Sequence, residues 1–573
     1  MRILLLTHAF NSLTQRLEAE LQGRGHEVSI EFDIADTVAE EAVALFKPQL
    51  IVAPYLRRAI PESIWSRHVC LIVHPGIVGD RGPSALDWAI QGGEGEWGVT
   101  VLQAEAAMDA GSIWASAVFP LRAAKKSSIY RNEVTQAATR AVLQAVERFA
   151  AGDFAPTPLA ACSDARGRLR PVMKQTDRAI DWQRDDTATV LRKINAADGF
   201  PGVADTLFGV ACHIFDAWSE AVLRGTADSK PGDLLARRET AVLRRTTDGA
   251  VWIGHARRVG DFKLPTTLAF AAESAVLPAA PLADWWRVDA ETWQDIAYEE
   301  SGGVGFLHFE FYNGAMSTSQ CERLRSALAW ARQRPIQVLV LTGGADFWSN
   351  GIHLNVIEAA ASPADESWNN INAMNDLARE LIEAGGQMTV AALAGNAGAG
   401  GCFLARAADL VWAREGVILN PHYKNMGNLY GSEYWTYLLP RRLGEQGVGD
   451  KSRATMRNRR PLTAQRAVET GFTDACLAGD VQAFRIDVAR RAAEIAAAPD
   501  LGQRLATKRE RRATDEAAKP LAAYREEELT HMRRNFYGFD PSYHVARHHF
   551  VRKSPASWTP RHLARHRDLG WKG

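Results

Sequence analysis

The sequence lacks the features that define several protein classes. Its six cysteines are scattered and form no CxxC pair, so neither a disulfide framework nor a metal site is expected. Its 67 basic residues are balanced by 67 acidic ones, so there is no basic excess that would indicate binding to nucleic-acid phosphates. No run approaches the roughly 18 to 20 apolar residues of a membrane span, and the apolar start MRILLLTHAF fits a buried strand better than a signal peptide. We therefore expect a cytoplasmic protein with no nucleic-acid or membrane partner.

The first part of the chain alternates short apolar runs with amphipathic stretches. The apolar runs are RILLLT, EVSIEF, QLIVAPY and HVCLIVH. This alternation predicts a doubly wound α/β domain. No GxGxxG motif follows the first run, so a dinucleotide site is not supported. Ligands of such sheets collect at the carboxyl ends of strands, and His74 is the last residue of HVCLIVH.

Later segments change in texture. Between about Lys174 and Arg258, short runs separated by turn signals predict a small β-rich module, and the stretch AAESAVLPAAPLADWW predicts a linker. Beyond about Ile296 the alternation resumes, with a helix expected at Gln320–Arg334, and the last third is largely helical. We therefore expect four parts, at residues 1–165, 166–275, 276–294 and 295–573.

The segment HPGIVGDRGPSALDWAIQGGEGEWGVTVLQAEAAMDAGSIWAS resembles the site of folate-dependent formyltransferases. The matching pieces are His74, Arg81-Gly82, Trp88-Ala89-Ile90, Gly98-Val99-Thr100 and Asp109-Ala110-Gly111. The run PQLIVAPYLRRAIPE resembles the pterin-binding loop of that family, and RAIDWQRDDTATVLRKINAADGFPG resembles its carboxyl-terminal domain. The resemblance implies 10-formyltetrahydrofolate as the substrate, with contacts from Tyr55, Ile60, His74, Gly76 and Asp109.

Formyl transfer passes through a tetrahedral intermediate that carries an oxyanion and must exchange protons. A histidine can stabilise that charge or supply a proton, and a carboxylate can orient the histidine. We therefore expect His74 and Asp109 to be catalytic. The family has an asparagine two residues before the histidine, where this chain has Ile72. Losing one oxyanion donor typically costs about 10²–10³ in rate, so either another donor substitutes or the acceptor is not the usual amine.

Residues 296 to 573 resemble the crotonase (enoyl-CoA hydratase/isomerase) family, whose fold is a ββα superhelix. FWSNGIHLN and AGNAGAGGCFLARAADL stand where that family places two backbone N–H groups at the thioester oxygen. By position these oxyanion donors are the amides of Ile352 and Gly400, and small residues let the thioester approach them. FYGFDPSYHVARHHFVRKSP resembles the last crotonase helix, which implies that Arg552 and Lys553 bind coenzyme A. A solvated basic helix is the alternative.

The two carboxylates of a hydratase are missing from this half. The first glutamate position holds Phe403, and the second falls near His422. Because adding water to a double bond requires two acid/base groups, hydration is not expected. The loop NPHYKNMGNLYGSEYW offers His422, Tyr423, Tyr430 and Glu433 instead, and GNLY resembles the loop of crotonase-fold methylmalonyl-CoA decarboxylases, in which a tyrosine sits at the thioester. Tyr430 and Glu433 are therefore the leading catalytic candidates, followed by His422.

Taken together, the two halves resemble the HypX (HoxX) hydrogenase-maturation proteins over essentially the whole chain. A folate formyl group and a CoA thioester share formyl-CoA as their simplest intermediate, which can be hydrolysed, transferred or decarbonylated. The resemblance implies production of carbon monoxide for the iron of NiFe-hydrogenase, with other maturation proteins as possible partners. Two alternatives stay open: an amine formyltransferase with a vestigial crotonase half, and a non-catalytic folate-binding scaffold.

Overall fold

The structure is a computed structural model that describes residues 1–163, 165–223, 228–280 and 292–568. The chain divides into two compact units. Unit 1 comprises Met1–Val259, Thr266–Pro278 and Pro555–Gly573, and unit 2 comprises Gly260–Pro265 and Ala279–Ser554. Most of the expected linker, residues 281–291, lies outside the described residues. In the part of the chain that the structure describes, no helix is long and apolar enough to cross a membrane.

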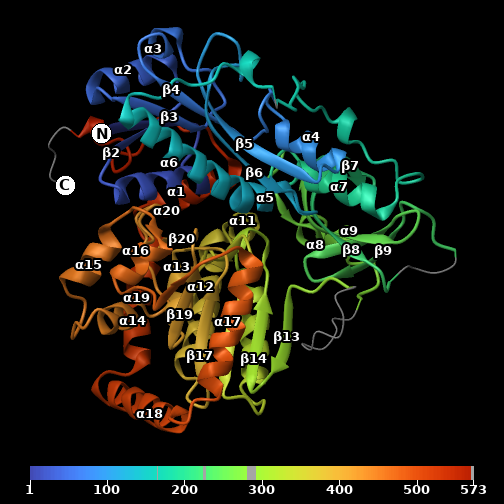
Figure 1. Cartoon of the computed structure of the whole chain (residues 1–573). Helices are drawn as coiled ribbons and strands as arrows, with labels where there is room; N and C mark the ends of the chain where they lie inside the picture. The colour runs from blue at the N-terminus through green and yellow to red at the C-terminus, as the bar shows by residue number, and fades with distance from the viewer. Residues whose placement is uncertain (164, 224–227, 281–291, 569–573) are drawn as a thin grey trace. The chain divides into compact units, whose positions relative to one another are not determined.

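A six-stranded sheet organises the first part of unit 1 (Figure 1). Its order is β2-β1-β3-β4-β5-β6, with β1 (Arg2–Thr7), β2 (Glu27–Phe32), β3 (Leu50–Tyr55), β4 (Cys70–His74), β5 (Glu96–Gln103) and β6 (Ile113–Pro120). The first four strands pair in parallel, which confirms the doubly wound α/β prediction. β5 and β6 run antiparallel to their neighbours, a departure from an all-parallel sheet. The loop between these two strands is too short for the crossover that a parallel pair requires.

Helices cover both faces of this sheet, which explains why the inner strands β1, β3 and β4 are largely apolar along their length. Ile3 and Leu5 pack with α1 (Ser12–Gly23) and α6 (Thr135–Ala151), whereas Leu4 and Leu6 pack with α2 (Asp36–Phe46) on the other face. Successive residues of a strand point to opposite faces of the sheet, so a strand that is covered on both faces needs apolar residues at successive positions. The shorter helices are α3 (Glu62–Trp65), α4 (Ala85–Gly92) and α5 (Lys126–Ile129).

The second part of unit 1 is a small β-rich module with an antiparallel path of strands. Their order is β7-β8-β11-β10-β9, with β7 (Val203–Leu207), β8 (Val210–Glu220), β9 (Leu234–Arg238), β10 (Ala241–Arg245) and β11 (Ala250–Arg258). Helix α7 (Thr187–Ala197) buries Val190 and Ile194 against it. α8 (Thr266–Ala269) and α9 (Ala271–Ser274) follow the sheet.

The end of the chain returns to unit 1 beside β2, where Figure 1 draws it in red next to the blue N-terminal strands. Leu563 accepts a hydrogen bond from the Ile30 amide at 3.0 Å. Glu31 is fully buried there and contacts Thr559, His566 at 2.9 Å and Arg567 at 2.7 Å. Burial alone would raise the pKa of the Glu31 carboxyl, but these three hydrogen-bond partners lower it. A buried carboxylate thus fastens the C-terminal segment to the first sheet.

Unit 2 is a superhelix in which successive turns each add one strand to two sheets, as the crotonase resemblance implies. The larger sheet has the order β13-β14-β15-β17-β19-β22, and the smaller one has the order β16-β18-β20-β21. The strands of the larger sheet are β13 (Ile296–Ser301), β14 (Val304–Phe309), β15 (Val338–Thr342), β17 (Met388–Leu393), β19 (Leu410–Arg414) and β22 (Ala475–Leu477). Those of the smaller sheet are β16 (Phe347–Ser349), β18 (Asn396–Gly398), β20 (Ile418–Asn420) and β21 (Leu462–Thr463).

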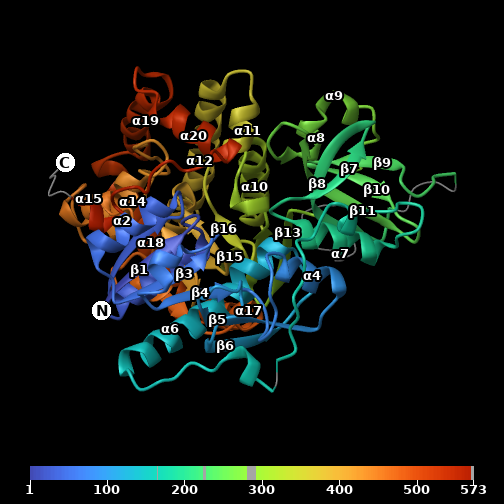
Figure 2. The ribbon, with the colours of Figure 1, turned by 90° about the horizontal axis from the view of Figure 1, so that it is seen from above.

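Helices enclose these sheets, and α19 (Leu521–Tyr537) and α20 (Ser542–Arg552) lie beside α11 (Leu354–Ala359) and α12 (Pro363–Ile382) (Figure 2). The helix expected at Gln320–Arg334 is α10 (Thr318–Ala331), which starts two residues earlier because Ser317 and Gln320 form a capping box. The remaining helices are α13 (Gly400–Arg406), α14 (Trp435–Arg442), α15 (Asp450–Arg457), α16 (Ala464–Glu469), α17 (Val481–Ala496) and α18 (Leu501–Ala518).

Candidate functional site

In unit 1, His74 lies at the carboxyl end of β4 between two carboxylates. Its Nε2 is 3.1 Å from Asp80 Oδ1, and its Nδ1 is 3.6 Å from Asp109 Oδ2. The imidazole is 5% exposed and the Asp80 carboxyl is buried. A carboxylate beside each ring nitrogen fixes the orientation of the imidazole, and each carboxylate can accept a proton from the nitrogen that it faces. The structure therefore brings His74 and Asp109 together and adds Asp80, which the sequence reasoning missed.

Close backbone approaches hold this site in shape. A Cβ atom at Gly76 would lie 2.4 Å from His74 Nε2, so only glycine fits against the imidazole. Asp109 has a left-handed backbone (φ 51°) in the loop between β5 and β6, and its carboxylate accepts the Gly82 amide at 3.1 Å. Gly76 O accepts the Thr100 hydroxyl at 2.9 Å. The glycines of the matched motif thus serve to place the histidine and its carboxylates.

The other residues expected to contact folate lie near the same strand ends. Tyr55 ends β3, with its ring edge-on to His8 at 5.9 Å. Ile60 is buried and packs in the core beside α2. Ile72, at the position of the family's asparagine, lies in β4 opposite Leu102 and contacts the same core. It therefore acts as a packing residue rather than as a hydrogen-bond donor.

In unit 2, the two segments expected to bind the thioester oxygen meet. Gly351, immediately before Ile352, has a left-handed backbone (φ 79°), and a Cβ atom there would lie 3.4 Å from the Gly400 amide nitrogen. Gly400 begins α13 directly after Ala399, whose φ is also positive at 46°. A Cβ atom at Gly400 would lie 2.5 Å from a Glu433 carboxyl oxygen. The segments that carry the two expected oxyanion donors therefore lie next to each other, and the Glu433 carboxyl lies beside Gly400.

The hydroxyl that bonds Glu433 belongs to Tyr423. Tyr423 Oη lies 2.5 Å from Glu433 Oε2 and 3.0 Å from the Ser432 carbonyl oxygen. Its ring stacks on Phe403, with centroids 5.7 Å apart and planes 9° apart. Phe403, which stands in the position of the first hydratase glutamate, therefore packs against one face of the Tyr423 ring. Sequence reasoning placed Tyr423 in the loop but did not select it.

Burial changes the acid–base chemistry of this pair. Glu433 is 1% exposed, and burial, followed by the negative charge of Glu528, raises the pKa of its carboxyl to about 8. Burial and the neighbouring Glu433 raise the pKa of the Tyr423 hydroxyl well above its usual value. A carboxyl that titrates near physiological pH can take up and release a proton there.

The other two candidates of the loop lie differently. Tyr430 stacks on His531, with centroids 4.0 Å apart, and its amide donates to Asn535 at 3.1 Å. Burial raises the pKa of its hydroxyl. His422 is buried next to Tyr423 in the chain. The structure thus pairs Glu433 with Tyr423 and not with Tyr430, since the ring of Tyr430 packs on α19.

The residues expected to bind CoA phosphates end α20. Arg552 Nε is 3.7 Å from Glu358 Oε1, and its guanidinium lies 5.0 Å from the centre of the Phe262 ring. Lys553 caps the helix with a left-handed backbone, and its Nζ lies 4.1 Å from the centre of the Phe550 ring. Burial lowers the pKa of the Lys553 ammonium. A role of these two residues in binding CoA stays a prediction.

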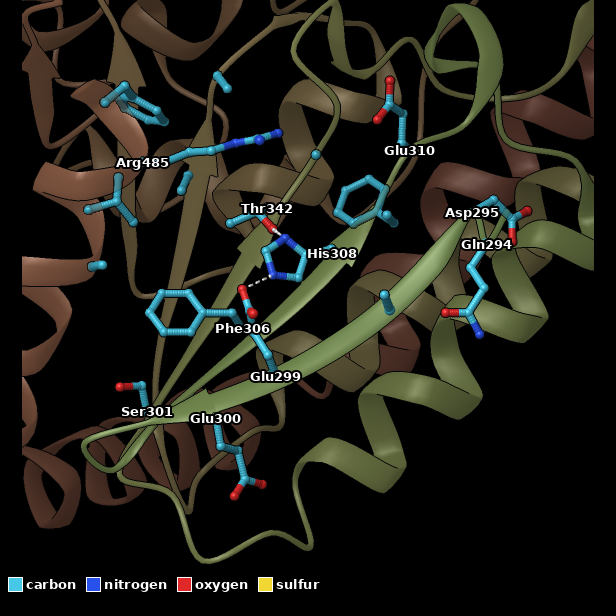
Figure 3. A pocket seen from close by; sticks show the side chains of 18 residues that line it. Gln294, Asp295, Glu299, Glu300, Ser301, Phe306, His308, Glu310, Thr342 and Arg485 are labelled. Atoms are coloured by element: carbon cyan, nitrogen blue, oxygen red, sulfur yellow. Dashed lines mark hydrogen bonds and ion pairs between the residues drawn. The ribbon is translucent and has the colours of Figure 1, made fainter. Parts of the chain in front are cut away.

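A cavity of about 430 Å³ opens elsewhere in unit 2, between β13, β14 and α17 (Figure 3). His308 points into it between Glu299, at 2.8 Å from Nε2, and Thr342, at 2.6 Å from Nδ1. Arg334 pairs with Glu300 at the same wall. The residues that line this cavity differ from those expected at the thioester. The imidazole of His308 is therefore held on both sides by hydrogen-bond partners within the cavity wall.

Family models match the same parts of the chain. The formyl transferase model matches residues 31–146, and the model of the formyl transferase C-terminal domain matches residues 172–269. The enoyl-CoA hydratase/isomerase model matches residues 304–561. A methionyl-tRNA formyltransferase of Ralstonia nicotianae is 26% identical over 40% of this chain and 69% of its own length.

Two similarities extend over the whole chain. The hydrogenase maturation factor HoxX of Bradyrhizobium diazoefficiens is 54% identical over 99% of this chain and 97% of its own length. The chain belongs to the HoxX/HypX family. The crystal structure of HypX from Aquifex aeolicus in complex with tetrahydrofolic acid is 47% identical, with a TM-score of 0.95, and the match covers 100% of both chains.

Membership of the HoxX/HypX family confirms the predicted fold class, a formyltransferase-like half followed by a crotonase-like half. The sequence did not lead us to Asp80, and it led us to choose Tyr430 rather than Tyr423 as the partner of Glu433. Asp80 stands inside the matched segment HPGIVGD, so its position six residues after the histidine was a usable signal. The resemblance of GNLY to a decarboxylase loop favoured Tyr430, and nothing in the sequence pointed to Tyr423 instead.

Proposed function

We propose that this chain transfers the formyl group of 10-formyltetrahydrofolate to coenzyme A and then decarbonylates formyl-CoA to carbon monoxide, the ligand for maturation of NiFe-hydrogenase. The observation that carries the proposal is the Tyr423–Glu433 pair against Gly400. It stands in a crotonase-like unit in which Phe403 replaces a hydratase carboxylate. A single carboxyl with a pKa near 8 suits moving one proton better than adding water.

The first step takes place at His74. The thiol of coenzyme A attacks the formyl carbon, the bond from carbon to the folate nitrogen breaks, and the thiol proton ends on that nitrogen. His74 accepts and returns this proton, while Asp80 and Asp109 hold its ring on both sides. The HypX complex with tetrahydrofolic acid supports folate as the ligand. Ile72 offers no donor for the usual amine chemistry, which favours a thiol as the acceptor.

The second step takes place at Glu433. The formyl oxygen accepts hydrogen bonds from the amides of Ile352 and Gly400, for which Gly351 and Gly400 leave room. The ionised Glu433 carboxylate takes the formyl proton, the carbon–sulfur bond breaks, and its electron pair leaves on sulfur. Carbon monoxide departs, and Glu433 returns the proton to the thiolate. The Tyr423 hydroxyl keeps the carboxylate pointed at the formyl group, and the buried surroundings disfavour hydrolysis.

The two steps belong on one chain because formyl-CoA is reactive. A covalent connection between two sites raises their effective concentration for a shared intermediate. Arg552 and Lys553 are the residues through which unit 2 binds the CoA phosphates in this proposal. We infer other hydrogenase-maturation proteins as partners that receive the product, and a cytoplasmic location.

The test uses the full-length protein with ¹³C-labelled formyltetrahydrofolate and coenzyme A, and traps the gas on deoxymyoglobin. We expect labelled carbon monoxide. His74→Asn should abolish it, and supplied formyl-CoA should restore it. Tyr423→Phe should instead let formyl-CoA accumulate. Labelled formate without labelled carbon monoxide would refute decarbonylation, and a maturation activity that survives both substitutions would favour a non-catalytic scaffold.

A further inference from the structure

The loop that carries Glu433 has an unusual backbone. Glu433 and Tyr434 both adopt the left-handed conformation, with φ of 57° and 60°. L-residues with side chains rarely adopt this region, and two in succession are rarer still. Such a conformation persists only where the surroundings hold it in place. Two buried side chains, from α12 and α19, do so.

Glu528 of α19 is the first of these side chains. It is fully buried, and its Oε1 accepts the amide and the hydroxyl of Thr436 at 2.8 and 2.6 Å. Its Oε2 accepts the Tyr434 amide at 3.0 Å and the Ser432 hydroxyl at 3.2 Å. One carboxyl thus accepts three hydrogen bonds from Tyr434 and Thr436 and shares the single Ser432 hydroxyl proton with Asn375.

Asn375 of α12 is the second. Its Oδ1 accepts the Glu433 amide at 2.8 Å and the Ser432 hydroxyl at 2.9 Å. It holds the same loop from the opposite helix but carries no charge. The two contacts therefore offer a matched pair, in which one side chain can act by geometry alone and the other by geometry and charge.

We propose that Glu528 is a positioning residue that holds Glu433 against Gly400 and also acts on it as a second buried negative charge. A role of Glu528 in catalysis rests on the proposed function, whereas its effect on the protonation of Glu433 does not. Burial raises the pKa of Glu528 to about 7, and the Thr436 hydroxyl and the backbone amides oppose that rise. Burial, together with the Glu528 charge, raises the pKa of Glu433 to about 8. The hydrogen bonds that the Glu528 carboxyl accepts favour its ionised form, and its negative charge keeps Glu433 protonated to higher pH.

The other titratable and charged groups near Glu433 do not carry this effect. Burial raises the pKa of Tyr423 and of the two nearby thiols, so all three are neutral at physiological pH. Two arginines act on the neighbouring Tyr434. The phenol is Tyr423, in the loop after β20, and the thiols are Cys321 of α10 and Cys402 of α13. The arginines are Arg379 of α12 and Arg525 of α19. Among the described residues, Glu528 is the anion that acts on Glu433.

The experiment follows the infrared C=O stretch of the protonated Glu433 carboxyl against pH in the full-length protein. The band is assigned by its loss in Glu433→Gln. In Glu528→Gln we expect the Glu433 midpoint to fall by about one pH unit, because a like charge nearby has been removed. In Asn375→Ala the loop loses two hydrogen bonds but no charge, so the midpoint should stay at the wild-type value. Equal midpoints in Glu528→Gln and the wild type would overturn the electrostatic role.

The wild type and Glu433→Gln provide a second test, which does not depend on whether Glu528→Gln folds. The buried carboxyl band that survives Glu433→Gln should vanish at lower pH than the Glu433 band. If that second carboxyl stays protonated through the Glu433 midpoint, Glu528 is not an anion there and the inference fails. The pH profile of carbon monoxide release should shift with the infrared midpoint. A protein that shows the infrared shift but releases no carbon monoxide contradicts the proposed function only.

Discussion

The buried Glu433 carboxyl should make the protein less stable as pH rises. Its pKa is about 8 in the folded chain, against 4.5 for the ordinary side chain. Between these two values the unfolded chain releases the proton and the folded chain keeps it. The unfolded state therefore binds fewer protons in this window, and stability falls with increasing pH. Below the lower value both states are protonated and the effect is absent.

The size of the effect follows from the two pKa values. Each pH unit inside the window costs about 1.4 kcal/mol, and the cost levels off near the folded value. From pH 5 to pH 8 the loss comes to about 3 kcal/mol. Glu433→Gln removes the titrating group, although its amide protons, facing Gly400, cost about 1–3 kcal/mol if they find no acceptor. That cost does not depend on pH, so the informative quantity is the change with pH in the stability difference between variant and wild type.

The measurement is urea unfolding of both proteins between pH 5 and pH 8, in the transition that responds to the substitution. The stability of Glu433→Gln relative to the wild type should rise by about 3 kcal/mol over this range. Glu415→Gln replaces an exposed carboxyl of the same unit and serves as the control, with a difference that stays flat. A flat difference for Glu433→Gln as well would show that this carboxyl is ionised in the folded state, and the reasoning would be wrong.

Four further predictions concern activity and the C-terminal segment. Single-turnover release of carbon monoxide from formyl-CoA should rise about tenfold per pH unit below the Glu433 pKa of about 8 and level off above it; a flat profile in stopped-flow trapping on myoglobin would contradict a Glu433 base. Tyr423→Phe should slow this step by about 10², whereas Tyr430→Phe keeps its ring stack and should lose far less; the reverse order would restore Tyr430 as the catalytic residue. Asp80→Asn removes one of the two carboxylates beside the imidazole and should slow formyl transfer by about 10², while release from supplied formyl-CoA stays unchanged. Glu31→Gln removes the charge that pairs with Arg567 and weakens the buried hydrogen bonds to Thr559 and His566, which should cost about 1–3 kcal/mol and would appear in limited proteolysis as earlier cleavage near Ser554; equal cleavage rates would show that the buried carboxylate does not fasten the segment.

The architecture was largely predictable because it depends on local periodicity. Continuous apolar runs such as residues 3–6 require burial on both faces, and that condition alone favours a doubly wound sheet. The direction of β5 and β6 was not predictable in the same way, since strand direction depends on how the chain returns and not on which residues are apolar. The return of the C-terminal segment to β2 was also out of reach. It depends on Glu31 and His566, which lie 535 residues apart.

The first site could be predicted in outline because its residues follow one another in a short motif. His74 and Asp109 appear in the order and context of the formyltransferases. Asp80 was missed because its role depends on the turn through Gly76, which brings the carboxyl back to Nε2 of the imidazole. The motif contains that turn, but a sequence does not state which way a side chain within it points.

The choice between Tyr423 and Tyr430 depended on backbone conformation. Resemblance to a decarboxylase loop favoured Tyr430, which lies three residues from Glu433 in the sequence. In the structure the chain turns left-handed at Gly431, where a Cβ atom would lie 2.2 Å from the Tyr423 ring. Glu433 is left-handed as well, and its carboxyl therefore meets the tyrosine ten residues upstream. A non-glycine residue gives no sequence signal for this conformation, because the contacts that stabilise it come from distant helices. The proposed catalytic pair, Tyr423 and Glu433, could therefore not be predicted, because the left-handed backbone that brings the two side chains together is set by contacts with distant helices.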